Sequence, residues 1–265
     1  MSDRQKTLAA AFQLSGVGIH SGQETTLQCL PAPENSGIVF EKGKKQIPAL
    51  IQNITDTKRG TSLGGILVVE HLLSAFFALG VDNVRIKVSG AEIPAMDGSS
   101  QPFVEAIQSA GIKEQSSPKT YIELSAPIRI EEKDAKLEAL PYSGFMVDFM
   151  VNFSPVGTQK LVFDLQKGDY AGEIAPARTF GCSEEIEALK QQGLGRGASL
   201  ENSLVLNQSG YINLPRFKDE LVRHKILDLI GDLALLGRPL RAKIKAVKSG
   251  HKMNAELVRR ILNNG

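Results

Sequence analysis

Residues 223–232 read RHKILDLIGD, and the spacing of their apolar side chains predicts an amphipathic helix. On its polar face, His224 and Asp228 are four residues apart, so an imidazole and a carboxylate are neighbours that can share one cation. Gly231 costs about 1 kcal/mol relative to alanine inside a helix, which indicates close packing against another segment. The alternative interpretation is a solvated polar stripe, the usual feature of such helices. A metal site therefore needs another ligand from elsewhere in the chain.

Residues 66–79 offer such a ligand. An apolar run leads into Glu70 and His71, and a second apolar run closed by Gly80 predicts a helix that begins at this pair. Burying the two side chains without partners would cost free energy. Either both face water at the start of the helix, or His71 is the third ligand and Glu70 takes a proton from metal-bound water.

The remaining histidines differ in context. His251 follows a Ser-Gly pair at a predicted strand-to-helix junction, where the backbone aims its ring. His20 lies in a glycine-rich turn, and we interpret it as a solvated polar residue. Three of the four histidines therefore sit at junctions or on one polar stripe, and two of those three have a carboxylate next door or one helical turn away. This coincidence supports the hypothesis of a mononuclear His/His/Asp zinc hydrolase.

Composition narrows the class of protein. The chain has 265 residues, 42% hydrophobic and 23% charged, which is ordinary for a globular protein and enough for two domains. A net charge of +2, spread evenly, argues against a nucleic-acid partner. Cys29 and Cys182, the only cysteines, suit a reducing compartment. With no signal-peptide pattern and no apolar run of about 18 residues, we expect a cytoplasmic protein without a membrane span.

Two local patterns predict the starts of helices. Ser100 before Pro102 predicts an N-cap for a helix over residues 102–109. A further helix is predicted over residues 183–192, followed by the glycine-rich residues 193–197. The spacing of these glycines matches neither the Walker nor the dinucleotide-binding loop, so we exclude a phosphate loop there.

Several longer motifs occur in order along nearly the whole chain. They are GVGIHSG (16–22), PAP (31–33), VEHLL (69–73), DN (82–83), EIP (92–94), DGS (97–99), ARTFG (177–181), VRHKILD (222–228), GD (231–232) and SGH (249–251) with Asn254. Through them the sequence resembles the bacterial UDP-3-O-acyl-N-acetylglucosamine deacetylases. These are zinc amidases that catalyse the committed step of lipid A, and hence lipopolysaccharide, biosynthesis.

The resemblance implies a metal centre and two groups that move protons. His71, His224 and Asp228 would hold one catalytic Zn²⁺, with water as the fourth ligand and Fe²⁺ as an alternative ion in the cell. Glu70 would be the general base. His251 would be positively charged and would stabilise the oxyanion or protonate the departing amine.

It also implies four supporting residues. Asp232, one turn beyond the metal-binding carboxylate, would orient the catalytic histidine. Thr179 would donate a hydrogen bond to the oxyanion. Phe180 would pack near the sugar, and Lys225 would meet the diphosphate of UDP.

The implied fold is α+β, with two domains of similar topology, helices sandwiched between two sheets and the active site at the domain interface. We expect the metal-site glutamate and first histidine in residues 1–115, the other ligands in residues 119–265, and a linker in the polar, proline-terminated residues 111–119. A small βαβ insert around residues 182–206 would form an apolar passage for the acyl chain. Three side chains could line this passage or form the insert's own core: Ile186, Leu189 and Leu194.

We therefore expect a monomeric, zinc-dependent hydrolase that removes the N-acetyl group of an amphiphilic small molecule, UDP-3-O-acyl-N-acetylglucosamine. The alternatives are a zinc deacetylase of another nucleotide sugar and a non-catalytic binder of acylated nucleotide sugars. Three features depart from the family pattern: residues 57–69 are shorter than usual, Cys182 replaces an aromatic residue, and Ser154-Pro155 replaces His-Pro.

Overall fold

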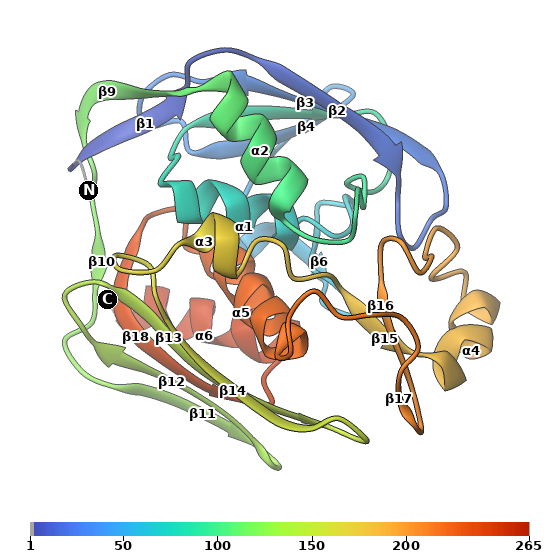
Figure 1. Ribbon diagram of the computed structural model, residues 1–265. Coiled ribbons are helices and arrows are strands. Elements are labelled where there is room, and N and C mark those ends of the chain that lie inside the picture. Colours follow the sequence, from blue (N-terminus) through green and yellow to red (C-terminus); the bar gives the residue numbers. More distant parts are fainter. Residues whose placement is uncertain (1–2, 265) are drawn as a thin grey trace.

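Two β-sheets enclose the main helices in a computed structural model that describes residues 3–264. Figure 1 shows one sheet above and one below, with α1 (Glu70–Leu79), α5 (Glu220–Leu233) and α6 (His251–Asn264) between them. α2 (Gln101–Ala110) packs beside α1. The α+β class predicted from the sequence is confirmed. Within residues 3–264, none of the helices combines the length and apolar character needed to cross a bilayer.

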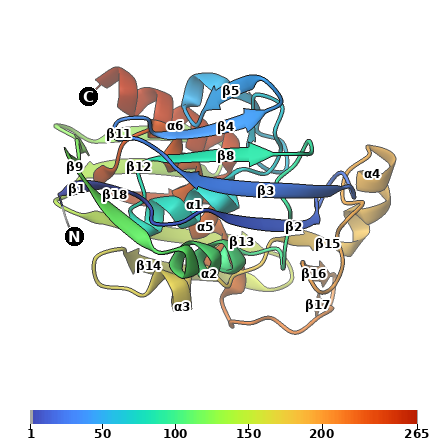
Figure 2. The same cartoon turned by 90° about the horizontal axis from the view of Figure 1, so that it is seen from above.

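The first sheet follows the order β2-β3-β8-β4-β5, and Figure 2 shows these strands side by side. Their bounds are Phe12–Val17, Glu24–Pro31, Val84–Val88, Ile38–Lys42 and Lys45–Pro48. Neighbours are antiparallel except β4 and β8, which are parallel. In β8 the valines and isoleucine point inward and the charged residues outward, which is the alternation of a sheet covered on one face.

The second sheet follows the order β11-β12-β18-β13-β14, with β10 added beside β18. The bounds are Ile128–Glu132, Ala135–Pro141, Leu240–Val247, Phe145–Phe153, Gly157–Asp164 and, for β10, Ile122–Glu123. Its central strand is antiparallel to β12 and parallel to β13, as β8 is to β3 and β4. The two sheets thus share one strand order. The division into domains at residues 115 and 119 stays a prediction.

The stretch predicted as a linker forms a strand in the structure. β9 (Ile112–Pro118) pairs antiparallel with β1 (Arg4–Leu8). Its polar side chains have partners inside the fold: Gln115 Oε1 accepts from Asn83 Nδ2 at 2.8 Å, and Ser116 Oγ donates to Glu34 at 2.5 Å. This strand was not predicted, because its distant partners are not visible in the local composition, and the role of the stretch as a connection between domains stays a prediction.

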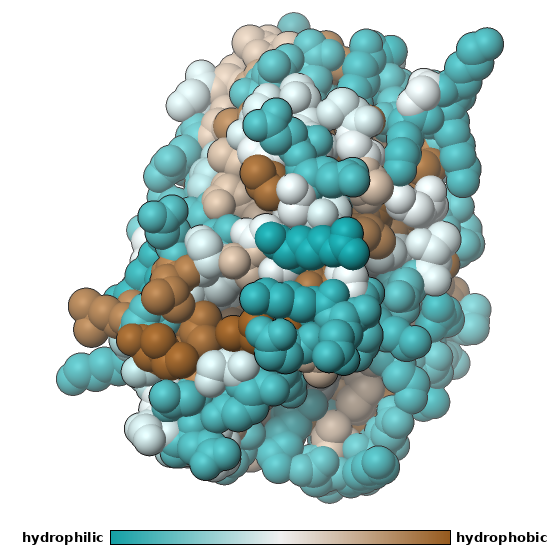
Figure 3. All heavy atoms as spheres, turned by 90° about the vertical axis from the view of Figure 1, so that its right-hand side faces the viewer, coloured by the Kyte–Doolittle hydropathy of each residue, from teal (hydrophilic) through white to brown (hydrophobic). Residues whose placement is uncertain are grey.

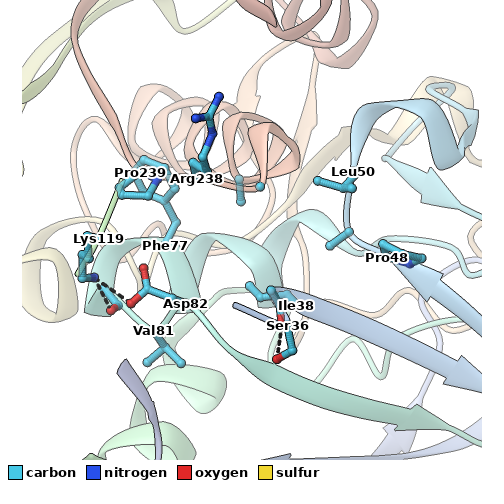
Figure 4. A pocket seen from close by; sticks show the side chains of 15 residues that line it. Ser36, Ile38, Pro48, Leu50, Phe77, Val81, Asp82, Lys119, Arg238 and Pro239 are labelled. Atoms are coloured by element: carbon cyan, nitrogen blue, oxygen red, sulfur yellow. Dashed lines mark hydrogen bonds and ion pairs between the residues drawn. The ribbon is translucent and has the colours of Figure 1, made fainter. Parts of the chain in front are cut away.

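The chain passes from the first half of the molecule to the second just after β9. The side chain of Lys119 is only 7% exposed there, and its Nζ donates to the Asp82 carboxylate at 2.9 Å and to Gly80 O at 2.8 Å (Figure 4). Both acceptors lie at the C-terminal end of α1. A pocket of about 110 Å³ lies beside this ion pair, with Phe77 and Leu50 among its walls. The ion pair therefore connects the segment at Lys119, where the chain passes between the two halves, to the end of α1, the helix that carries Glu70.

A small unit projects from one side of the molecule (Figure 1). It consists of β15 (Phe180–Cys182), the 3-10 turn η2 (Ser183–Glu185), α4 (Ile186–Gln191), β16 (Leu204–Asn207) and β17 (Gly210–Tyr211). β15 and β16 are parallel, so the unit contains a βαβ motif. We call this unit, residues 180–211, the insert.

Apolar side chains gather on the face of the molecule that carries the insert (Figure 3). Leu214, just beyond β17, is 87% exposed, and Ile186, Leu200 and Ile212 are also exposed. Leu189 and Leu194 are half-buried. The lining of an acyl passage by Ile186, Leu189 and Leu194 stays a prediction.

Shorter elements complete the described chain. They are η1 (Ile51–Asn53), β6 (Ile54–Asp56), β7 (Ser62–Leu63), α3 (Tyr170–Glu173) and η3 (Ala234–Leu236). β6 and β7 pair with each other, and the loop between them approaches the N-terminal end of α1. This loop becomes important at the candidate active site.

Candidate active site

The two helices that carry the predicted ligands pack directly on each other, and one glycine makes this possible. A Cβ atom placed on Gly231 of α5 would lie 2.1 Å from the carbonyl oxygen of Glu70 on α1. Only hydrogen fits there. The close packing that the sequence predicted at Gly231 is therefore present, and it brings the start of α1 against the C-terminal part of α5.

Three buried donor atoms converge where these helices meet. Asp228 Oδ1 lies 3.2 Å from His224 Nε2 and 3.7 Å from His71 Nε2, and the three atoms lie within 4.8 Å of one another. The two imidazole rings stand edge to face, with centroids 5.0 Å apart. Within residues 3–264, Asp228 Oδ1 has no hydrogen-bond partner. A buried, unpaired carboxylate oxygen facing two imidazole nitrogens fits a divalent cation.

Hydrogen bonds fix the ring of His224 and the main chain of His71. His224 Nδ1–H donates to Ala177 O at 3.1 Å, which leaves Nε2 with its lone pair toward the cluster. The hydroxyl of Ser100 donates to His71 O at 2.8 Å. The predicted N-cap at Ser100 was wrong in this respect, because the hydroxyl serves the neighbouring helix α1 and makes no capping bond to α2.

The protonation states of the three groups suit a metal. Burial lowers the pKa of His71 to about 3 and also lowers the pKa of His224, so both rings are neutral at pH 7. Burial opposes the charged form of Asp228, but neighbouring cationic groups outweigh it and hold the pKa of this carboxyl well below its usual range. The permanent cation among them is Lys225, whose Nζ donates to Asp228 Oδ2 at 2.7 Å.

Glu70 lies beside this cluster and titrates near neutrality. Burial raises its pKa to about 7. Thr61 N donates to Glu70 Oε2 at 2.9 Å, and Glu70 Oε1 lies 3.9 Å from His251 Nε2. A buried carboxylate with a pKa near 7 can accept a proton at physiological pH and release it again.

His251 and Asp232 form an ion pair beside the same cluster, with His251 Nε2 3.8 Å from Asp228 Oδ2. His251 Nδ1 donates to Asp232 Oδ2 at 2.9 Å, and Asn254 Nδ2 donates to the same oxygen at 2.8 Å. Burial opposes the charged imidazolium, but the carboxylates of Asp232 and Asp228 outweigh burial and raise the pKa of His251 to about 9. The ring is therefore a cation at pH 7.

Three further predicted residues border the same cavity. Thr179 and Phe180 follow Arg178, whose buried guanidinium is fixed by Glu220 at 3.0 Å. The ring of Phe180 lies 5.8 Å from the His224 ring. Lys225 Nζ lies 5.4 Å above the Phe180 ring. The structure thus brings all the predicted site residues to one cavity of about 260 Å³ or to its immediate wall, whereas the roles of these residues stay predictions.

Sequence analysis missed some residues of this site. Thr61 is buried, and its hydroxyl donates to Asp232 Oδ1, yet it lies in a loop without a helical or strand pattern. Arg59 lines the cavity from the same loop. His20 also lines the cavity, with Nε2 3.0 Å from Arg59 O, whereas we interpreted it as a solvated turn residue. The only sequence signal for these residues was the presence of His20 in a family motif.

Comparison with known proteins agrees with this geometry. The sequence pattern of the family described as UDP-3-O-acyl N-acetylglycosamine deacetylase matches residues 5–263. The chain belongs to this family. The resemblance seen in the sequence motifs is therefore confirmed over almost the entire chain.

Relatives from three bacteria carry the name UDP-3-O-acyl-N-acetylglucosamine deacetylase. The protein of Myxococcus xanthus (strain DK1622) is 42% identical over 275 residues, which cover 99% of this chain and 88% of the relative. The proteins of Pseudomonas entomophila (strain L48) and Coxiella burnetii (strain RSA 493 / Nine Mile phase I) are 42% identical over 273 residues, covering 98% of this chain and 90% of each relative. The similarity thus extends over both sheets and the insert.

Proposed function

We propose that this family member removes the N-acetyl group of UDP-3-O-acyl-N-acetylglucosamine with one Zn²⁺ bound by His71, His224 and Asp228. As a member of the family, the chain is a deacetylase of lipid A biosynthesis. The observation that carries the metal proposal is the unpaired, buried Asp228 Oδ1 between two neutral imidazoles. Three protein ligands leave a coordination position open, as a catalytic zinc site requires.

An N-acetyl amide is a poor electrophile and water is a poor nucleophile, so the enzyme must activate both the amide carbonyl and the water. When bound, the metal supplies Lewis-acid chemistry that polarises the carbonyl and lowers the pKa of water toward about 7. Glu70 accepts the proton of the attacking water, for which its pKa of about 7 is well matched. Glu70 is on the first turn of α1, next to His71, so the base and the ligand are held by the same helix.

The oxyanion and the departing amine need positive charge and protons. His251, charged at neutral pH and held by Asp232, stabilises the oxyanion or protonates the amine. Thr179 adds a hydroxyl donor at the rim of the cavity. Collapse of the tetrahedral intermediate breaks the C–N bond and gives acetate and UDP-3-O-acyl-glucosamine.

Recognition of the substrate falls to residues farther from the scissile bond. Phe180 packs against the sugar, and Lys225 exchanges its contact with Asp228 for the diphosphate when substrate binds. The insert binds the acyl chain of the substrate. We further propose that the enzyme acts as a cytoplasmic monomer.

Glu70→Ala tests the proposed role of the base. Zinc content should stay at one ion per chain, because His71, His224 and Asp228 are intact, while acetate release should fall by about 10²–10⁴-fold. Metal analysis and acetate release on the same preparation check both statements. A zinc-loaded Glu70→Ala variant that keeps full activity would exclude Glu70 as the base. A wild-type protein that binds the substrate with zinc present but never releases acetate would favour a non-catalytic binder.

A further inference from the structure

Three consecutive residues connect the catalytic carboxylates to the surface of the molecule. Thr61 contacts both carboxylates, since its N–H donates to Glu70 Oε2 at 2.9 Å and its hydroxyl donates to Asp232 Oδ1. A Cβ atom on Gly60 would lie 3.0 Å from Glu70 Oε1, so this residue also lies against the base. Any displacement of this segment therefore acts on Glu70 and Asp232 together.

Arg59 forms the outer end of this segment. Its guanidinium Nη2 lies 2.8 Å from Glu185 Oε2 of the insert, and its carbonyl accepts from His20 Nε2 at 3.0 Å. Arg59 has φ of 59°, a left-handed conformation that is uncommon for a residue with a side chain. These contacts hold the loop against the insert in spite of the unfavourable backbone.

The insert is also bonded to the turn that contains His20. Arg196 N donates to His20 O at 3.2 Å, and Gly197 N donates to Ile19 O at 3.1 Å. Gly195 N donates to His20 Nδ1 at 3.4 Å, which leaves the Nε2 proton for Arg59 O. A Cβ atom on Gly197 would lie 2.3 Å from Gly18 O, so the two backbones meet as closely as possible. Loop, turn and insert thus meet at one rim of the cavity.

We propose that Arg59 is a positioning residue whose ion pair with Glu185 closes the insert over the cavity and, through Thr61, keeps Glu70 and Asp232 in place. This inference rests on the proposed function. Arg59 and Glu185 are about half exposed, at 49% and 46%. Because exposed ion pairs are weak, the contact can open for substrate and close again in each turnover.

A charge exchange tests the pair. Arg59→Glu and Glu185→Arg should each lower kcat/KM by about threefold to fivefold, because a weak exposed ion pair contributes a free energy of that size. The loss should include a lower kcat as well as a change in KM. The double variant restores the pair with reversed charges and should recover most of the loss. Hydrogen exchange at the amides of residues 195–197 should speed up in each single variant and slow down again in the double variant.

Two neighbouring residues provide matched controls. Lys58→Glu reverses the charge beside Arg59, and Glu187→Arg reverses a charge on α4 whose ion pair, with Lys190, stays within that helix. Both should leave kcat/KM and the exchange of residues 195–197 unchanged.

The outcomes separate this inference from the proposed function. If the wild-type enzyme releases acetate but the double variant recovers none of the lost activity, the proposed role of the ion pair between Arg59 and Glu185 is wrong. Loss of activity in Arg59→Glu alone would instead mean that Arg59 contacts substrate directly. Absence of acetate release by the wild type would contradict the proposed function, while the exchange measurement would still test the contact itself.

Discussion

Two groups of side chains line the candidate active-site cavity, and different forces hold them in place. One group lies on α1 and α5, and the other lies at the rim, where the loop of residues 59–61, the turn at His20 and the insert meet. His71, His224 and Asp228 are buried, on two helices that pack directly on each other where Gly231 meets Glu70. The rim is held by a half-exposed ion pair and a few backbone bonds to the insert. The difference indicates that the chemical groups need a rigid frame, whereas the insert needs contacts that can open.

The largest expected effect comes from breaking the rigid frame at Gly231. Gly231→Ala would place a Cβ atom 2.1 Å from the backbone oxygen of Glu70, and neither atom can move away by rotation of a side chain. We expect a loss of about 1–3 kcal/mol in the free energy of unfolding. Turnover should fall by about 100-fold or more, because misplacing a catalytic group by about 1 Å has an effect of that size.

Gly181 in the insert provides the matched control. A Cβ atom there meets nothing within 4 Å, so Gly181→Ala should change the free energy of unfolding by less than about 0.5 kcal/mol. Denaturant unfolding and acetate release of the two variants check the prediction. Equal stability and activity of Gly231→Ala and wild type would contradict the rigid-frame interpretation.

A smaller effect is expected from changing the charge behind His251. In the wild type, activity should rise as pH increases through about 7, where Glu70 loses its proton, and fall as pH increases through about 9, where His251 loses its own. Asp232→Asn removes the carboxylate that raises the pKa of His251. The upper limb of the profile should therefore move to lower pH, with activity reduced by about 10–100-fold.

The pH dependence of kcat/KM in both proteins checks this prediction. The lower limb should move less than the upper one, because burial is the main cause of the raised pKa of Glu70 and the charge of Asp232 only adds to it. An upper limb that stays in place in the variant would mean that His251 does not need its proton. The rim variants of Arg59 and Glu185 should show the smallest losses of all.

The helix-borne part of the site could be predicted from the sequence because it depends on local periodicity. Three features can be recognised from the local sequence alone. They are the four-residue spacing of His224 and Asp228, the Glu70-His71 pair at the start of a helix, and the unusual glycine inside a helix at position 231. Family motifs supplied the remaining residues. The α+β fold followed from the same motifs.

The rim could not be predicted, since it depends on contacts between distant segments. Thr61 meets Asp232, 171 positions along the chain, and Gly195 meets His20, 175 positions away. Neither Thr61 nor Arg59 stands in a periodic pattern. The strand β9 could not be predicted for the same reason, because its polar residues are bound by Asn83 and Glu34, which lie far away in the sequence.

Acetate release from UDP-3-O-acyl-N-acetylglucosamine, measured before chelation, after chelation and after the return of zinc, is the decisive test of the proposed metal site. Activity should be present in the purified protein, disappear when the metal is removed, and return when zinc is added to about one ion per chain. Activity that survives complete removal of the metal would contradict the central claim that His71, His224 and Asp228 act through a bound ion.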